Sequence, residues 1–337
     1  MISRRSNLRF IYGRKSSSSW IGAIHAQNAF KADGINLKCL VDADLGKAEE
    51  FAKELNCRAS SDFQSVLDDP EINAVLVGTP TVTHYDYVKR ALLSGKDVFA
   101  EKPLGVDIDQ IDECYGLAEA GGKILFLAFQ RRFDPAFGEL IQAARSGKLG
   151  EVQFVRSTSR DSPMPSIDYL KTSCGIFHDC LVHDLDMICQ VFDEYPVEVH
   201  THAHCFIPEI AAIDDVDTVL VSLKFASGAI GSIEVSRRSN YGYDQRLEAL
   251  GSEGMYEVRN PTSDSLLRSL DGGAQASPIP YSFPQRYRVA YNDELLAFGR
   301  CVAERSPSPV THEQSRLNFL IAEAMEESLK KGGPVRI

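Results

Sequence analysis

The sequence lacks several features that would assign it to a membrane or to nucleic acid. No apolar run approaches the roughly 20 residues that a membrane-spanning helix needs. No basic stripe interleaved with aromatic residues is present, and the formal net charge is −11. The chain therefore offers no evident basic surface to neutralise the phosphates of a nucleic acid. The eight cysteines form neither a CxxC pair nor a close framework, which predicts reduced thiols in a reducing compartment. We therefore expect a cytoplasmic protein with neither nucleic acid nor membrane as a partner.

The amino-terminal segment has an unusual composition. No acidic residue precedes Asp33, whereas arginines and Lys15 surround a serine run at 16–19. This composition resembles an organelle transit peptide, which makes organelle targeting the alternative to a cytoplasmic location. The segment continues without a spacer into the first predicted helix, so its cleavage would remove a strand of the fold.

A chain of 337 residues fits two domains of roughly 150 residues each. Between residues 35 and 146, apolar runs alternate with amphipathic stretches, which predicts βαβ units and a doubly wound parallel sheet. The predicted strands are 36–41, 73–78, 97–100 and 124–129, with 8–12 as a displaced first strand followed by a loop at 13–19. The predicted helices are 45–55, 84–93, 108–120 and 135–146.

After Gly150 the sequence changes to β-rich runs joined by turn signals such as Ser227-Gly228 and 252–254. The predicted strands are 152–159, 197–206, 218–225, 229–236 and 246–250, and the predicted helices are 175–192, 287–305 and 312–329. The Pro-, Gly- and Ser-rich stretch 271–284 predicts a long surface loop. The expected fold is α/β: a Rossmann-type doubly wound parallel sheet over 1–130, then an α/β domain with a large, mostly antiparallel open sheet over 131–337. The C-terminal helices are expected to pack back on the first domain.

An acidic residue at the end of the second predicted strand, Asp42, indicates a dinucleotide site. A carboxylate there accepts hydrogen bonds from a ribose diol and repels a 2′-phosphate, which favours NAD over NADP. Capping of the following helix is the alternative role. The companion GxGxxG motif is absent: with Gly22 as its last glycine, Ser17 and Ser19 fill the two earlier positions. Serine there is expected to weaken cofactor binding, because glycine permits the tight turn and close approach to pyrophosphate.

The segment 100–105, AEKPLG, places Lys102 where a predicted buried strand ends. Ligands of open parallel sheets bind at that edge, and Pro103 pushes the preceding residue into an extended conformation. Lys102 is therefore a candidate active-site residue, and a solvated loop lysine is the alternative. A cis peptide before Pro103 is expected, since tight turns at functional sites are where such bonds occur.

Asp179 and His183 lie four residues apart on a predicted helix and so share one of its faces. A carboxylate beside an imidazole orients the ring and raises its basicity, so His183 would exchange a proton near neutral pH. A capped helix start is the alternative interpretation. The alternating residues His200, His202 and His204 indicate either a zinc or nickel site or an exposed strand face. No carboxylate or cysteine completes a ligand set at suitable spacing, so no metal is expected.

Several segments together resemble the Gfo/Idh/MocA oxidoreductase family, from about residue 20 to the end. They are 79–81, 100–105, 130–135, 175–186, 241–248 (YGYDQRLE) and the RYxxAY pattern within 286–291. The resemblance implies a Rossmann domain, a second α/β domain, and assembly as a homodimer or homotetramer through its large sheet.

The resemblance also implies roles for individual residues. The expected catalytic residues are Lys102, Asp179 and His183. The expected cofactor-binding residues are Gly22, Asp42, Thr79, Pro80, His84, Glu101 and Lys102. The expected substrate-binding residues are Arg131, Asp161, Tyr241 and Tyr287, with Asp161 standing where asparagine is usual.

The implied activity is NAD-dependent oxidation of a secondary alcohol in a cyclic polyol, with myo-inositol as the expected substrate. His183 would take the hydroxyl proton, Asp179 would balance the imidazolium, and Lys102 would stabilise the developing alkoxide. The ammonium group of one domain and the imidazole of the other are expected to converge on the same oxygen. A related sugar or dihydrodiol oxidoreductase is one alternative. A non-catalytic variant with impaired cofactor binding is another, because the glycine loop is altered.

Overall fold

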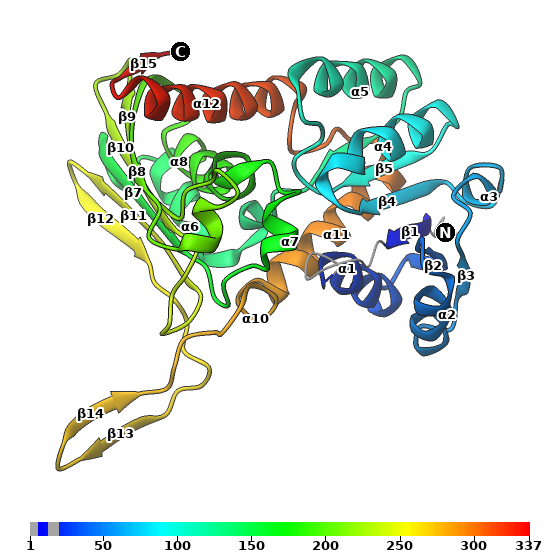
Figure 1. Cartoon of the computed structure of the whole chain (residues 1–337), viewed down its shortest axis with the longest axis horizontal. Helices are drawn as coiled ribbons and strands as arrows, with labels where there is room; N and C mark the ends of the chain where they lie inside the picture. Colours follow the sequence, from blue (N-terminus) through cyan, green and yellow to red (C-terminus); the bar gives the residue numbers. More distant parts are fainter. Residues whose placement is uncertain (1–5, 13–19) are drawn as a thin grey trace. The chain divides into compact units, whose positions relative to one another are not determined.

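The computed structural model describes residues 6–12 and 20–337, and the chain divides into two compact units (Figure 1). The first unit consists of Met1–Gln130, Thr172–Cys174 and Val289–Leu317. The second consists of Arg131–Lys171, Gly175–Arg288 and Asn318–Ile337.

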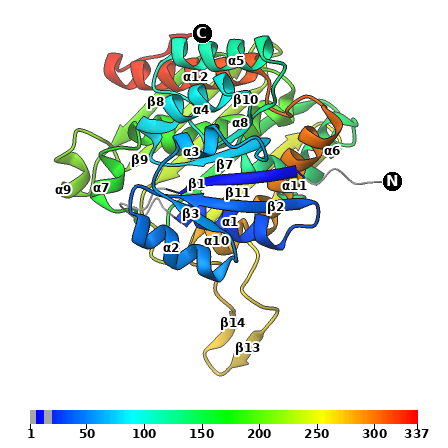
Figure 2. The same ribbon diagram turned by 90° about the vertical axis from the view of Figure 1, so that its right-hand side faces the viewer.

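The first unit is built on a six-stranded parallel sheet with the strand order β3-β2-β1-β4-β5-β6. Its strands are β1 (Ser6–Tyr12), β2 (Ile35–Val41), β3 (Arg58–Ser60), β4 (Ala74–Gly78), β5 (Asp97–Ala100) and β6 (Leu125–Leu127). Its helices include α1 (Trp20–Lys31), α2 (Leu45–Glu54), α3 (Gln64–Leu67), α4 (His84–Leu93) and α5 (Ile108–Ala120). The order is that of doubly wound dinucleotide-binding sheets, which confirms the predicted fold class. The displaced first strand is confirmed as β1, which pairs with β2 and β4 at the centre of the sheet (Figure 2).

The local sequence explains the boundaries of these elements. Every residue of β4 and β5 is buried, as expected for strands covered by helices on both faces. Asp44 and Asp107 begin α2 and α5, since their carboxylates accept hydrogen bonds from the backbone N–H groups of Lys47 and Gln110. Aromatic rings of β5, β6 and α11 (Arg288–Glu304) form one core of this unit, with Phe99 5.3 Å from Phe126 and 5.6 Å from Phe298.

The second unit is built on a seven-stranded sheet with the order β12-β11-β7-β10-β9-β8-β15. Its strands are β7 (Val152–Arg160), β8 (Pro196–His204), β9 (Thr218–Phe225), β10 (Ile230–Ser236), β11 (Asp244–Gly251), β12 (Gly254–Val258) and β15 (Val335–Arg336). Its helices include α6 (Pro135–Arg145), α7 (Ile167–Leu170), α8 (Val182–Phe192), α9 (Pro208–Ala211) and α10 (Phe283–Arg286), while α12 spans His312–Lys331. Only β7 and β10 pair in parallel, so the predicted mostly antiparallel sheet is confirmed.

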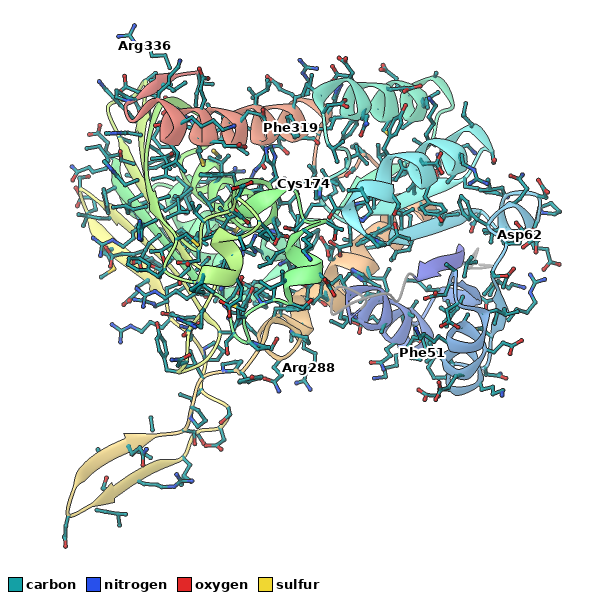
Figure 3. The ribbon with its side chains drawn as sticks, viewed as in Figure 1. Phe51, Asp62, Cys174, Arg288, Phe319 and Arg336 are labelled. Atoms are coloured by element: carbon teal, nitrogen blue, oxygen red, sulfur yellow. The ribbon has the colours of Figure 1, made fainter. Side chains whose placement is uncertain are left out.

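Helices α6 and α8 pack on one face of this sheet (Figure 1). Figure 3 shows the side chains of the described residues on the ribbon. Phe319 of α12, labelled in Figure 3, lies with its ring centre 4.7 Å from that of His178. The opposite face, called the outer face of the sheet, carries exposed side chains such as Leu220, Ile230 and Leu250.

Several predicted elements differ from the structure, and three of these differences have a clear physical reason or consequence. The stretch predicted as a long loop at 271–284 contains β14 (Gly273–Ala276), which pairs with β13 (Leu267–Leu270) in an exposed hairpin. The turn residues Asp271-Gly272 are a strong hairpin signal that the loop prediction ignored. Strand β6 is shorter than predicted because its partner β5 ends at Ala100. The predicted helix at 175–192 begins with a π-helical turn over Phe177–Leu181 before α8.

Candidate active site

In the first unit, the predicted cofactor residues follow the carboxyl ends of neighbouring strands. Asp42 follows β2, Thr79 and Pro80 follow β4, and Glu101 and Lys102 follow β5. This edge is where open parallel sheets bind ligands. The Lys102–Pro103 peptide bond is cis, as the sequence predicted. The side chain of Lys102 is partly exposed, so it is accessible at this edge.

Gly22 lies in the first turn of α1, directly against the end of β4. A Cβ atom added to Gly78 would lie 3.3 Å from the Cα atom of Gly22. Glycine therefore permits the close helix–strand contact that the last glycine of a dinucleotide motif provides. Ser17 and Ser19, the altered motif positions, lie outside the described residues. The part of the cradle that is described fits a dinucleotide.

Asp42 is buried, and its Oδ1 accepts a hydrogen bond of 2.8 Å from the backbone N–H of Asp44. The cap of α2 is Asp44, so the alternative in which Asp42 caps that helix is wrong. The bond to Asp44 fixes the orientation of the Asp42 carboxylate at the end of β2. A carboxylate held there suits a ribose diol.

His84 connects the loops that follow β4 and β5. Its Nε2 lies 2.7 Å from the carbonyl oxygen of Thr79, and its Nδ1 lies 2.8 Å from that of Pro103. Burial lowers the pKa of His84, while the two carbonyl groups oppose that shift. Because both ring nitrogens face backbone oxygens, His84 positions the Thr79 and Lys102-Pro103 loops. A direct contact of the ring with a cofactor stays a prediction.

In the second unit, Asp179 lies in the π-helical turn, a feature often found at functional sites. Its Oδ1 accepts a 2.6 Å hydrogen bond from the hydroxyl of Tyr169, and its Oδ2 accepts one of 2.6 Å from Nη1 of Arg237. Tyr169 and Arg237 were not predicted from the sequence. His183 lies one turn further on, half-buried on α8.

Arg237 is fully buried among three carboxylates. Besides Asp179, it faces Asp161 at 3.7 Å and Asp215 at 3.9 Å. Burial raises the pKa of Asp161, Arg237 opposes the rise, and the Asp179 carboxylate adds to it. The guanidinium therefore holds together several acidic groups that would otherwise repel each other.

Strand pairing explains why Arg237 meets Asp161. The last register pair of the parallel strands β7 and β10 is Arg160 with Ser236. Asp161 and Arg237 are the next residues of the two strands, so they meet at the same edge. The sequence signal that could have identified Arg237 is its position directly after a predicted strand. The local sequence does not show which strand pairs with that one, so it could not identify Asp161 as the partner.

Arg131 lies among hydrogen-bond acceptors of the second unit. This side chain is buried, with Nη1 2.8 Å from Asp184 and Nη2 donating to Gln245 at 2.6 Å and to Ser159 at 3.1 Å. Its terminal nitrogens are thus engaged by protein acceptors. The structure places Arg131 in an internal ion pair, and its predicted contact with substrate stays a prediction.

The two predicted substrate tyrosines have different environments. Tyr287 is fully buried, and the guanidinium of Arg286 lies over its ring, 4.8 Å from the ring centre. The Tyr287 hydroxyl lies 3.4 Å from Oε1 of Gln245. Burial raises the pKa of Tyr287 to about 12. Tyr241 is 56% exposed and donates a 2.6 Å hydrogen bond to Asp244. Tyr287 therefore packs in the interior of the unit, whereas Tyr241 lies at its surface.

The alternating histidines lie on β8. The rings of His200 and His202 are 4.4 Å apart, and that of His204 packs 4.6 Å from Phe206. His202 and His204 are exposed and His200 is partly exposed, which fits the exposed-face alternative.

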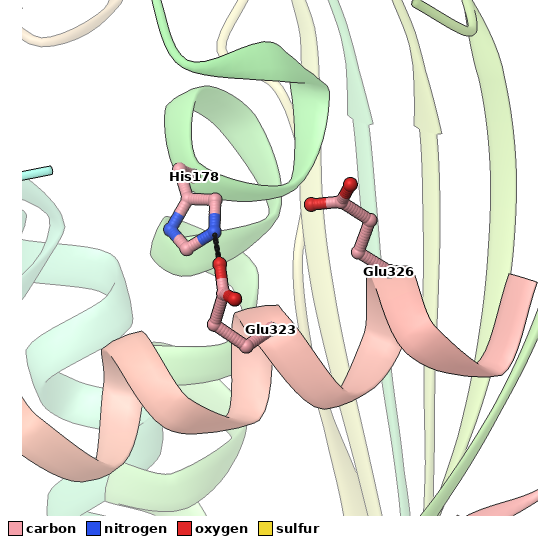
Figure 4. A group of neighbouring side chains, drawn as sticks. All are labelled: His178, Glu323 and Glu326. Carbon is pink, nitrogen blue, oxygen red and sulfur yellow. Dashed lines mark hydrogen bonds and ion pairs between the residues drawn. The ribbon is translucent and has the colours of Figure 1, made fainter. Parts of the chain in front are cut away.

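A separate group joins His178 to two glutamates of α12 (Figure 4). Nε2 of His178 lies 2.7 Å from Oε1 of Glu323, and Glu326 forms an ion pair of 2.5 Å with Lys330. Each carboxylate thus has a nitrogen partner, so we assign this group to ion pairing.

Comparisons with known proteins show which proteins the chain is similar to. Residues 18–129 match the oxidoreductase family with an NAD-binding Rossmann fold, and residues 137–257 match the C-terminal domain of the GFO/IDH/MocA group. The chain is 35% identical to the myo-inositol 2-dehydrogenase of Thermotoga maritima, covering 94% of this chain and 96% of that protein. It is 33% identical to the scyllo-inositol 2-dehydrogenase (NAD(+)) of Bacillus subtilis, and the match covers 94% of this chain and 93% of that protein. The crystal structure of a myo-inositol dehydrogenase from Corynebacterium glutamicum superimposes with a TM-score of 0.91 at 30% identity, covering 98% of each chain.

Proposed function

Because the chain belongs to the Gfo/Idh/MocA oxidoreductase family, we propose that it oxidises a secondary alcohol of an inositol with NAD+ as the hydride acceptor. The observation that carries this proposal is the edge of the first sheet, where Asp42 follows β2 and Glu101 and Lys102 follow β5. Relatives at about a third identity over most of the chain are inositol dehydrogenases.

Residues of the first unit would hold the cofactor, which supplies a hydride acceptor when bound. Asp42 would accept hydrogen bonds from the adenosine ribose, and Gly22 would allow α1 to pack closely against β4, so that the N-terminus of α1 lies at the edge of the sheet where the pyrophosphate binds. Thr79, Pro80 and Glu101 follow β4 and β5 and would surround the nicotinamide end. His84 would act on the cofactor site through the two loops that it connects.

Two side chains would handle the reacting hydroxyl group. His183 would accept its proton, while the Nζ of Lys102 would donate a hydrogen bond to the same oxygen and stabilise negative charge developing there. Asp179 would balance the imidazolium of His183. Its carboxylate is already oriented by Tyr169 and Arg237, so it need not reorganise during the reaction.

The test is an NADH-absorbance assay of the purified protein with myo-inositol, scyllo-inositol and glucose. One named relative is a myo-inositol 2-dehydrogenase and another a scyllo-inositol 2-dehydrogenase, so the assay also decides between these two substrates. We expect kcat/KM for one inositol to exceed that for glucose by at least about tenfold, the range that one pocket contact provides. Preference for an aldose would favour the sugar-oxidoreductase alternative. Failure of NADH to bind saturably in a fluorescence titration would favour the cofactor-impaired variant.

Cofactor preference should depend on Asp42. We expect Asp42→Ala to raise the KM for NAD+ about 10- to 100-fold, because hydrogen bonds to a charged group contribute about 1.5–3 kcal/mol. The same change should reduce discrimination against NADP+, since the repelling carboxylate is lost. Asp44→Ala is the matched control: it should lower the Tm slightly through the lost helix cap and leave the NAD+/NADP+ ratio unchanged. Equal cofactor ratios for both variants would contradict the role of Asp42.

We further propose that copies of this chain associate through the outer face of the seven-stranded sheet. Register places Met255, Leu250, Phe154 and Ile230 in one row across β12, β11, β7 and β10. Met255 and Ile230 are each 51% exposed, and in the next row Arg156 lies opposite Glu248. A row of exposed apolar side chains beside both signs of charge is self-complementary across a two-fold axis.

Light scattering should therefore find the wild-type protein larger than one chain. Ile230→Arg should shift it towards the monomer, because a charge would be buried without a partner. Leu267→Arg, on the exposed hairpin, is the control and should leave the mass unchanged. A monomeric wild type would contradict this proposal.

The cellular location is a further proposal. No helix within the described part of the chain is long and apolar enough to cross a membrane. All eight cysteines are free thiols. We infer a reducing compartment, the cytoplasm, and a cell fractionation that recovered the protein inside an organelle would favour the targeting alternative.

A further inference from the structure

A buried group of ionisable residues lies behind Lys102 in the first unit. The preceding residue, Glu101, is 8% exposed, and its Oε1 lies 2.8 Å from Nε2 of His25. His25 belongs to α1 and is fully buried, with its ring edge-on to Phe99 at 4.9 Å and to Tyr291 at 5.6 Å. These aromatic contacts fix the imidazole against the Glu101 carboxylate.

A second carboxyl group, that of Glu294, faces the same region from α11. Glu294 is fully buried, and neither of its oxygens has a hydrogen-bond partner of good geometry in the described part of the chain. Nδ1 of His25 is likewise buried and unpaired there. Burial raises the pKa of Glu294 well above its ordinary value, the Glu101 carboxylate adds to the rise, and the backbone of Phe129 opposes it.

Two buried carboxylates within electrostatic range of each other cannot both be charged at low cost. Glu101 has the imidazole of His25 as a partner and the ammonium group of Lys102 next to it in the chain. Glu294 has neither. Two further titratable groups lie in this region: Tyr291, whose ring contacts His25, and His84 of α4, which interacts electrostatically with Glu101 and Lys102. The negative charge therefore belongs on Glu101, and the proton belongs on Glu294.

We propose that Glu294 is a positioning residue: it remains a neutral carboxylic acid in the folded protein. Glu101, which is paired with His25, then carries the one negative charge of these two carboxyl groups and precedes Lys102 in the chain. The second consequence rests on the function proposed above. One carboxylate near the nicotinamide site favours NAD+, whose ring is cationic, over NADH, whose ring is neutral.

Glu294→Gln tests the protonation state, because glutamine copies the shape and neutrality of the protonated acid. In the unfolded chain Glu294 loses its proton near its ordinary pKa, whereas in the folded chain it holds the proton to higher pH. Its contribution to stability is thus complete at low pH and is lost as pH rises towards its folded pKa. Glutamine has no such loss.

We therefore compare full-length Glu294→Gln with wild type, both without cofactor. The Tm of the variant minus that of wild type should increase by roughly 3–8 °C between pH 5 and pH 8. Glu304→Gln, exposed on the same helix, is the control, and its Tm difference from wild type should not change with pH. A Tm difference for Glu294→Gln that stays constant or shrinks as pH rises would overturn the proposal.

The functional consequence is measured by titrating NAD+ and NADH separately. Glu294→Gln should keep the ratio of the two Kd values within about twofold of wild type, since neither form carries charge at this position. Glu101→Gln should weaken NAD+ binding more than NADH binding. If Glu294→Gln shifts the ratio tenfold or more, Glu294 carries charge and the proposal is wrong. If wild type binds neither nucleotide, the proposed function fails, while the pH-dependent Tm still decides the protonation state.

Discussion

Lys102→Ala is expected to lower kcat about 10²- to 10³-fold, the loss typical of removing one donor that stabilises developing negative charge. The Kd for NAD+ should change less than about threefold, because the loops holding the cofactor keep their own contacts. His84 still connects the Thr79 and Pro103 carbonyls in this variant. Steady-state kinetics with an inositol, combined with an NAD+ titration, separates the two effects.

The control for this substitution is Lys53→Ala, an exposed lysine on α2 in the same unit. It removes an equal charge away from the sheet edge and should leave both kcat and the Kd for NAD+ unchanged. Turnover by Lys102→Ala within a few fold of wild type would show that Lys102 is a solvated loop residue. Loss of NAD+ binding without loss of kcat at saturating cofactor would assign Lys102 to the cofactor alone.

Arg237→Met should destabilise the second unit by about 3–5 kcal/mol, because it leaves buried carboxylates without their common partner. The affected carboxylates belong to Asp161, Asp179 and Asp215. Without the guanidinium, burial and repulsion from the Asp179 carboxylate raise the pKa of Asp161 further above its ordinary value. The variant therefore loses stability as pH rises through that range, and its deficit should be largest near neutral pH and smaller near pH 4.

Urea unfolding followed by circular dichroism measures this loss. Arg237→Met should lower the unfolding midpoint, and the decrease should be larger at pH 7 than at pH 4. Arg238→Met, the exposed neighbour, is the control. A stability loss no greater than that of Arg238→Met, or one independent of pH, would contradict this role of Arg237.

Much of the candidate site could be located from the sequence, because the signals are local. The helix at His84–Leu93 and the strand at Asp97–Ala100 have the predicted bounds. Lys102 follows that strand as expected, and Asp42 follows β2. Glu294 could have been found as well: it falls among Tyr291, Leu295 and Phe298, the apolar positions of one helical face. A charged residue on such a face is a recognisable signal of a buried ionisable group.

The sequence alone determined the positions of the main helices and strands and which residues follow the strands, since periodicity, caps and turn residues act over a few positions. Only the tertiary structure decided which of these side chains meet. Arg237 reaches Asp179 across 58 residues, and His25 reaches Glu101 across 76. Both contacts depend on strand pairing and packing between elements distant in the chain, and no local pattern specifies such partners. The same packing decided burial, which sets the charge that Glu294 and Asp161 can carry.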